Sequence, residues 1–169
     1  MLRWHRHGIV AMVVYAILVG FLSMGCAKDK GQEAPNFVLK SIANEEVSLK
    51  DMNGKVILLN FWATWCGPCL VEIPDLIQLE ETYREKGLQV VGIVLGSGSA
   101  ENVGKSVQKH GINYVILMGN NKVTQDYGGI RGVPTTFLID RRGNIQKSYV
   151  GARSYETFEK DILPLLNKH

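Results

Sequence analysis

Two cysteines separated by two residues, Cys66 and Cys69, follow an apolar stretch in the sequence FWATWCGPCLVEIP, and a carboxylate, Glu72, comes three residues after the second cysteine. A cysteine pair at this spacing can ligate a metal ion, form a structural disulfide or exchange disulfides with another molecule. These three uses need different partners elsewhere in the chain, so the rest of the sequence discriminates between them.

A metal site or a haem site lacks the necessary ligands. Structural zinc needs four, usually from a second C-x-x-C pair or a histidine pair. Besides this pair the chain has only Cys26 and four scattered histidines, which are His5, His7, His110 and His169. Covalent haem attachment needs a histidine directly after the second cysteine, where this chain has Leu70. We therefore expect no metal and no cofactor beyond a redox-active disulfide of the cysteine pair itself.

A redox role for the pair has a specific physical basis, whereas a structural disulfide closing so short a ring would add little stability. Cys66 is predicted at the start of a helix, where free backbone N–H groups and the helix dipole stabilise a thiolate. Gly67 lets a substrate backbone approach closely, and Pro68 is well tolerated in a first turn. Cys69, one turn further on, is predicted to be the less exposed cysteine, which resolves a mixed disulfide.

Apolar strands and amphipathic helices alternate on both sides of the pair. Short strands are predicted at 37–39 and 46–49, and longer ones at 55–62, 88–95, 113–118, 135–140 and 144–150. Helices are predicted from the cysteine pair to about residue 86 and at 101–110, 122–127 and 155–166. Pro74 is expected to kink the first helix, and Pro164 to fray the last. This order predicts a mixed central sheet covered on both faces, a three-layer α/β/α sandwich.

The first 27 residues differ from the rest of the chain. A basic start is followed by an apolar run, Ile9 to Leu22, and the small-residue stretch SMGC. Residues 1–27 are therefore predicted as a signal or membrane anchor, either an uncleaved helix or a lipoprotein signal with Cys26 as the lipidated residue. The basic residues lie before the apolar run, so the chain after it is expected on the extracytoplasmic, periplasmic side of the cytoplasmic membrane, where disulfides persist. Residues 28–35 are predicted as a tether, and 36–169 as the folded domain.

The composition fits one globular domain, with 46% hydrophobic and 21% charged residues in a chain of 169. The net charge is +3, and without Arg3 and Arg6 of the N-terminal segment it is +1. No dense basic stripe remains, so we expect no nucleic-acid partner. The domain is expected to act as a monomer.

Two motifs, FWATWCGPC and GGIRGVPTTFLID (residues 128–140), resemble the active-site stretch and the cis-proline segment of thioredoxins. The phrase CGPCLVEIP, an N-terminal hairpin at 37–49, extra chain between about 95 and 118 and the anchor resemble the membrane-anchored thiol-disulfide oxidoreductases of the TlpA/ResA type. The resemblance covers about residues 34–166. It implies a thioredoxin fold with a central insertion, and an oxidoreductase that reduces disulfides outside the cytoplasm, commonly for cytochrome c maturation.

The resemblance also implies roles for single residues. Pro134 matches the cis-proline, and a cis bond after Val133 would leave backbone groups facing Cys66, able to pair with an extended substrate. Asn60 stands where thioredoxins have a buried aspartate, and Glu72 matches a functional glutamate of ResA-type proteins. Burial would raise the pKa of Glu72 and couple its titration to the thiols. Trp65 is expected either to pack beside the motif together with Trp62 or to contact partners.

The sequence thus predicts a protein-disulfide reductase with Cys66, Cys69 and Glu72 as catalytic residues. Trp65, Gly67, Pro68, Val133 and Pro134 are predicted to contact the substrate. The expected partners are a disulfide-containing exported protein such as apocytochrome c and a transmembrane thiol electron donor. Two alternatives stay open, a thiol peroxidase of the peroxiredoxin type and a copper-delivering binding module. The first usually has a proline as well as a threonine before its reactive cysteine, and only Thr64 is present here.

Overall fold

The computed structural model describes residues 31–167. The predicted anchor, with Cys26 as its candidate lipidation site, lies outside the described residues. Between residues 31 and 167 no helix is both long and apolar enough to cross a membrane.

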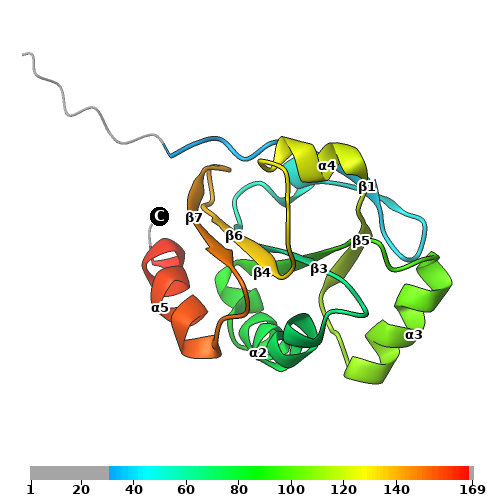
Figure 1. Cartoon of the computed structure of the whole chain (residues 1–169). Coiled ribbons are helices and arrows are strands. Elements are labelled where there is room, and N and C mark those ends of the chain that lie inside the picture. Colours follow the sequence, from blue (N-terminus) through cyan, green and yellow to red (C-terminus); the bar gives the residue numbers. More distant parts are fainter. Residues whose placement is uncertain (1–30, 168–169) are drawn as a thin grey trace, which may run out of the picture. The chain divides into compact units, whose positions relative to one another are not determined.

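A five-stranded sheet with the strand order β5-β4-β3-β6-β7 forms the centre of the domain (Figure 1). Within this sheet β3, β4 and β5 run parallel to one another, β6 is antiparallel to β3, and β7 is antiparallel to β6. Their bounds are β3 (Val56–Trp62), β4 (Leu88–Val94), β5 (Val115–Met118), β6 (Thr135–Ile139) and β7 (Ile145–Val150). The predicted mixed sheet is confirmed, and so is the N-terminal hairpin of β1 (Val38–Lys40) and β2 (Glu46–Ser48).

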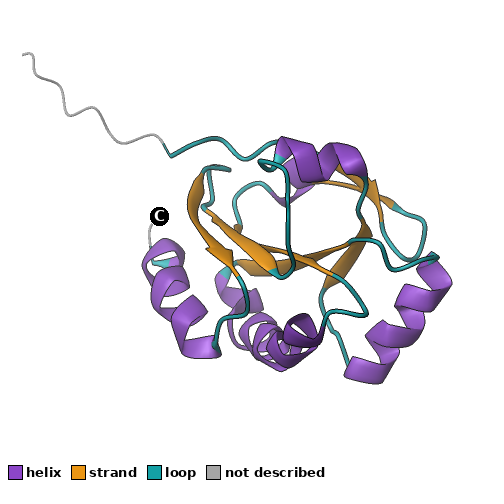
Figure 2. Cartoon of the chain, viewed as in Figure 1, coloured by secondary structure: helices purple, strands orange, loops and turns teal. Residues whose placement is uncertain are grey.

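Helices and the hairpin cover the two faces of this sheet (Figure 2). One face carries α2 (Gly67–Tyr83), α3 (Ala100–His110) and α5 (Tyr155–Leu166), and the other carries α4 (Asn121–Asp126), the hairpin and a short 3-10 helix at Leu49–Met52. The predicted three-layer sandwich is therefore confirmed. The central insertion supplies α3 and β5.

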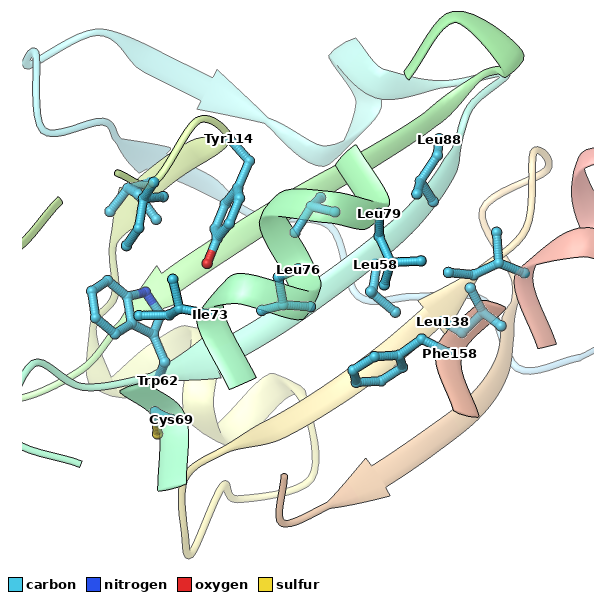
Figure 3. Close-up of a cluster of buried hydrophobic side chains, with 14 of the residues drawn as sticks. Leu58, Trp62, Cys69, Ile73, Leu76, Leu79, Leu88, Tyr114, Leu138 and Phe158 are labelled. Carbon is cyan, nitrogen blue, oxygen red and sulfur yellow. The ribbon is translucent and has the colours of Figure 1, made fainter. Parts of the chain in front are cut away.

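Side chains of β3 alternate between the two cores, because successive strand residues point to opposite faces of a sheet. Leu58 and Trp62 belong to the core under α2 and α5, shown in Figure 3, whereas Leu59 and Phe61 belong to the core under the hairpin and α4. Asn60 has the parity of Leu58 and Trp62. Its polar side chain therefore points toward α2, the helix that begins at the cysteine pair.

The antiparallel pairing of β3 with β6 brings two distant segments to one end of the sheet. Near the end of β3, Phe61 is paired with Thr135, the first residue of β6. The chain after β3 and the chain before β6 therefore meet. The described chain begins at the other end, where Ala34 N–H donates to Gly143 O and Ile145 N–H to Gln32 O. Part of the predicted tether thus packs on the β6–β7 turn, at the end opposite the cysteines.

Neither helix proline ends its helix. The helix α2 is continuous through Pro74 to Tyr83, where a 3-10 turn at Arg84–Lys86 follows, and α5 continues past Pro164 to Leu166. The predicted fraying at Pro164 is therefore wrong. Both prolines lie on exposed helix faces, where a carbonyl without an intrahelical partner can bind water, while buried neighbours such as Ile73 and Leu165 hold the helices on the sheet.

Arg141 binds backbone carbonyls of three separate segments at the end of the sheet opposite the cysteines. Its guanidinium donates to Gly54 O at 2.8 Å and to Lys86 O and Leu166 O at 3.1 Å each.

We expect Arg141→Ala to lower the free energy of unfolding by about 2 kcal/mol, because three carbonyls lose a charged donor. Urea unfolding of the oxidised protein measures this. Arg142→Ala is the matched control, since the exposed Arg142 side chain makes no such contact; equal losses in both variants would contradict the prediction.

Candidate active site

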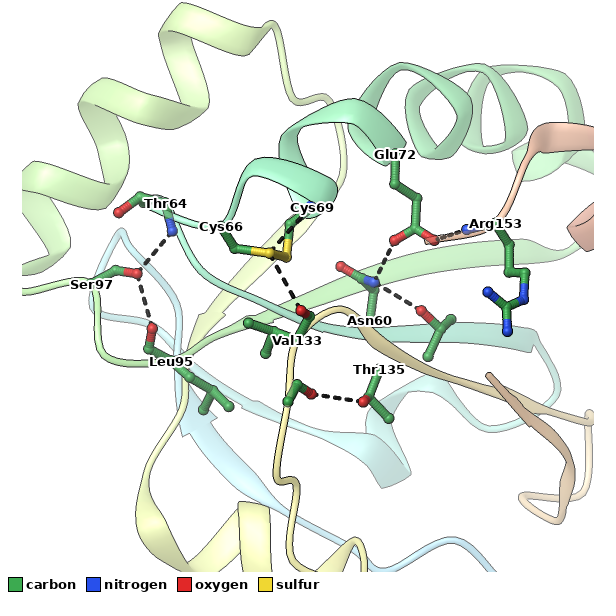
Figure 4. Close-up of a disulfide and its surroundings, with 12 residues drawn as sticks. Asn60, Thr64, Cys66, Cys69, Glu72, Leu95, Ser97, Val133, Thr135 and Arg153 are labelled. Atoms are coloured by element: carbon green, nitrogen blue, oxygen red, sulfur yellow. Dashed lines mark hydrogen bonds between the residues drawn. A yellow bond between two sulfur atoms is a disulfide. The ribbon is translucent and has the colours of Figure 1, made fainter. Parts of the chain in front are cut away.

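The two cysteines form a disulfide at the start of α2, with an S–S distance of 2.06 Å (Figure 4). Cys66 is the N-cap residue, and its Sγ accepts the N–H of Cys69 at 3.2 Å. The predicted position at a helix start is confirmed. In the reduced protein this N–H and the helix dipole favour the thiolate of Cys66. Cys69 is 2% exposed and Cys66 5%, so Cys69 is the more enclosed of the two.

The segment before β6 faces the disulfide. The peptide bond between Val133 and Pro134 is cis, which confirms the prediction made from the GVPT motif. The carbonyl oxygen of Val133 lies 3.5 Å from Cys66 Sγ, where the thiol of the reduced protein could donate to it. Two further hydrogen bonds fix the segment, one from Thr135 Oγ1 to Gly132 O and one from Gly151 N–H to Pro134 O, both 2.8 Å long.

Glu72 is buried on the sheet side of α2, with 2% of its surface exposed. The N–H of Arg153 donates to its Oε1 at 2.9 Å, and the side-chain amide of Asn60 donates to its Oε2 at 3.1 Å. Figure 4 shows the Glu72 carboxylate and the Cys69 side chain projecting from α2 toward the same face of the sheet. Glu72 is therefore not solvent-exposed, although most glutamates in helices are.

Burial raises the pKa of Glu72 from 4.5 to about 7, because the ionised carboxylate loses its hydration. The hydrogen bonds from Arg153 and Asn60 oppose this rise, and the negative charge of Asp75 adds to it. A carboxyl group with a pKa near 7 can both accept and release a proton at neutral pH. The site therefore combines a dithiol with an acid–base group on the same helix.

Asn60 and Arg153 shape the surroundings of Glu72, although the sequence marks neither as a site residue in its own right. The amide nitrogen of Asn60 donates to both Glu72 and Thr136 Oγ1, the latter at 2.8 Å. An ionised carboxylate only accepts hydrogen bonds, so the amide nitrogen faces Glu72 in that state, and in Figure 4 the amide oxygen points toward the disulfide. The guanidinium of Arg153 binds the carbonyls of residues 150–152, which holds the turn that presents its own N–H to Glu72.

The residues predicted to contact substrate surround the disulfide. Gly67, Pro68 and Trp65 are exposed, and Val133 is half-buried. The two tryptophans have different environments: Trp62 is a core residue at 1% exposure, whereas Trp65 is 68% exposed. The prediction that both tryptophans pack beside the motif is therefore wrong, and the alternative, an exposed Trp65, is confirmed. The roles of these residues toward a substrate stay predictions.

Comparison with known proteins assigns the chain to a family. The family model described as "AhpC/TSA family" matches residues 30–148. The thiol-disulfide oxidoreductase ResA of Geobacillus thermodenitrificans is 31% identical over 154 residues, with 91% of this chain and 88% of the relative covered. The thioredoxin-like protein YneN of Bacillus subtilis is 36% identical over 135 residues, with 79% and 78% covered.

Solved structures agree with this assignment. A thiol:disulfide interchange protein of the thioredoxin family from Chlorobium tepidum TLS superimposes with a TM-score of 0.76 at 33% identity, over 83% of this chain and 100% of that chain. The chain therefore belongs to the AhpC/TSA family and is a thioredoxin-fold thiol-disulfide oxidoreductase of the TlpA/ResA type.

Proposed function

We propose that this chain is a membrane-tethered reductase of protein disulfides that works outside the cytoplasm, in the maturation of c-type cytochromes. The observation that carries the proposal is the buried Glu72 on the helix that holds the dithiol, in a chain where Asn60 replaces the buried aspartate of thioredoxins. A carboxyl group with a pKa of about 7 at this place matches the functional glutamate that the resemblance to ResA-type proteins implies.

The reaction transfers two electrons from the dithiol to the substrate. The Cys66 thiolate attacks one sulfur of the substrate disulfide; a mixed disulfide forms and the other substrate sulfur leaves as a thiolate. Glu72 then takes the proton of Cys69, and the Cys69 thiolate attacks Cys66 Sγ. The Cys66–Cys69 disulfide forms and the second substrate thiolate leaves. The domain ends oxidised, in the state that the structure contains, and the substrate ends reduced.

The dithiol lies where both the substrate and an electron donor can reach it. The chain enters the domain at the β6–β7 turn, whereas the disulfide lies at the opposite end of the sheet. A tether attached there leaves the dithiol free for an oxidised C-x-x-C-H segment of an apocytochrome c. Each turnover oxidises the domain, so a transmembrane thiol donor must reduce it again. We propose that the domain works as a monomer, since the exchange needs only one dithiol.

Deletion of the gene in its native host tests this function. We expect covalently bound haem c to fall severalfold, and to return with the intact gene but not with a Cys66→Ser variant, because the nucleophile is then missing. A membrane-permeant dithiol in the medium should also restore it, since reduction is the missing step. Haem c is measured by haem staining of washed membranes under denaturing conditions. An unchanged haem c content would refute the cytochrome assignment while leaving the oxidoreductase activity itself intact.

A further inference from the structure

The loop after β4, residues 95–99, is bonded to the segment directly before Cys66. The N–H of Thr64 donates to Ser97 Oγ at 3.0 Å, and the indole N–H of Trp65 donates to Gly96 O at 2.8 Å. Figure 4 shows the Ser97 side chain between Thr64 and Leu95. This loop therefore holds both residues that lead into the reactive cysteine, although it lies some thirty residues away along the chain.

Ser97 uses its hydroxyl group as both acceptor and donor. It accepts the Thr64 N–H and donates to Leu95 O at 3.0 Å. Alanine at this position would leave that N–H and that carbonyl without these partners. The glycines on either side have positive φ angles, +53° at Gly96 and +79° at Gly98, a conformation that other residues rarely adopt. The loop is thus shaped to place the Ser97 hydroxyl and the Gly96 carbonyl at the active site.

Trp65 is the residue on which these contacts act. Trp65 precedes Cys66 and is 68% exposed, yet its indole N–H is fixed by the Gly96 carbonyl. An exposed aromatic ring held in one place contributes strongly to protein–protein contacts, because little side-chain entropy is lost when a partner covers it. A small disulfide can react at Cys66 without covering this ring, whereas a polypeptide disulfide brings flanking side chains over it.

Building on the proposed reduction of protein disulfides, we infer that Ser97 is a positioning residue for polypeptide substrates of the thiol–disulfide exchange. By binding the Thr64 N–H and the Leu95 carbonyl, Ser97 fixes the loop whose Gly96 carbonyl holds the Trp65 indole. The Trp65 ring is thereby kept beside Cys66 as a contact for apolar side chains that flank the substrate disulfide. The chemical step at the sulfur does not involve Ser97. Its contribution is a preference for polypeptide disulfides with apolar flanking residues over small disulfides.

Two disulfides presented to the pre-reduced enzyme test this inference. One is a peptide disulfide flanked by leucine and phenylalanine, and the other is bis(hydroxyethyl) disulfide. Stopped-flow and acid-quench measurements give a second-order rate constant for each, and the ratio of peptide to small disulfide is compared among variants. We expect Ser97→Ala to lower this ratio about fivefold, and Trp65→Phe, which removes the indole N–H but keeps an aromatic ring, to lower it similarly. Ser97→Thr retains the hydroxyl and should keep this ratio at the wild-type value.

Ser99→Ala is the matched control in the same loop. Ser99 Oγ accepts the N–H of Asn102 at the start of α3, so its loss weakens a helix cap without touching Trp65. The ratio should stay at the wild-type value in this variant. The indole N–H signal of Trp65 in nitrogen-15 NMR spectra should move in Ser97→Ala and not in Ser99→Ala. An unchanged ratio in Ser97→Ala, or an equal fall in Ser99→Ala, would overturn the inference.

Discussion

A variant with serine in place of Cys69 is expected to accumulate covalently joined to its substrates. Cys66 keeps its place at the start of α2 and still attacks a substrate disulfide, but the sulfur that lies within bonding distance of it is gone. Resolution then depends on external thiols, and we expect the mixed disulfide to persist at least about 10³-fold longer, because an intramolecular attack at high effective concentration is lost. Non-reducing gels and mass spectrometry of the variant purified from its native host measure the adducts.

Cys66→Ser is the matched control for this trapping. It removes the sulfur at the helix start, next to the Val133 carbonyl, and leaves the more enclosed Cys69 as the single cysteine of the site. We expect no adducts from it. If Cys66→Ser collected substrates and Cys69→Ser did not, the order of the two cysteines in the reaction would be the reverse of the one proposed. Adducts in neither variant would count against reduction of protein disulfides altogether.

Much of this site follows from local sequence rules. A cysteine before Gly-Pro at the start of an apolar helix pattern predicts an N-cap position, and period-two alternation along β3 places Asn60 on the face under α2. Helical spacing places Glu72 one turn after Cys69. The burial of Glu72 follows less directly, because a glutamate beside buried residues can still reach solvent by its long side chain. The family resemblance, rather than the helix pattern, favoured burial.

Other parts of the site could not be predicted, because they depend on backbone groups in loops. The Glu72 carboxylate binds the main-chain N–H of Arg153, and Trp65 binds the main-chain carbonyl of Gly96. Every residue type except proline carries such an N–H, and every residue carries such a carbonyl, so residue types do not indicate which one is used. The two glycines around Ser97 do indicate an unusual loop, but not the element against which it lies.

The buried carboxyl group of Glu72 makes the stability of the domain depend on pH. Its pKa is about 7 in the folded protein, against the ordinary glutamate value of 4.5 that applies to the unfolded chain. Between these values the folded protein binds a proton that the unfolded chain has lost, so stability falls as the pH rises from about 4.5 to 7. Above pH 7 the burial of the ionised carboxylate costs about 3 kcal/mol. Such a cost at a site beside a dithiol is typical of a functional group rather than a structural one.

Glu72→Gln is therefore expected to make the protein slower and more stable at the same time. At pH 8 the variant cannot take the proton of Cys69, and we expect the resolving step to slow about 10²-fold. At pH 5.5, where the wild-type carboxyl is protonated, the two rates should converge. The free energy of unfolding at pH 8 should rise by about 2 kcal/mol, because the buried charge is removed while one of the two hydrogen bonds at Glu72 is lost.

The chromogenic disulfide dithiobis(nitrobenzoate) separates the two steps. The attack of Cys66 releases one coloured thionitrobenzoate, and the attack of Cys69 releases the second. Asp75→Asn is the control on the same helix: it removes a charge that raises the pKa of Glu72, so the midpoint of the second release should move to lower pH while its amplitude stays. Superimposable pH profiles for wild type and Glu72→Gln would return Glu72 to a structural role. A loss of rate together with a gain in stability has no structural explanation, because a group that only supports the fold cannot destabilise it when present.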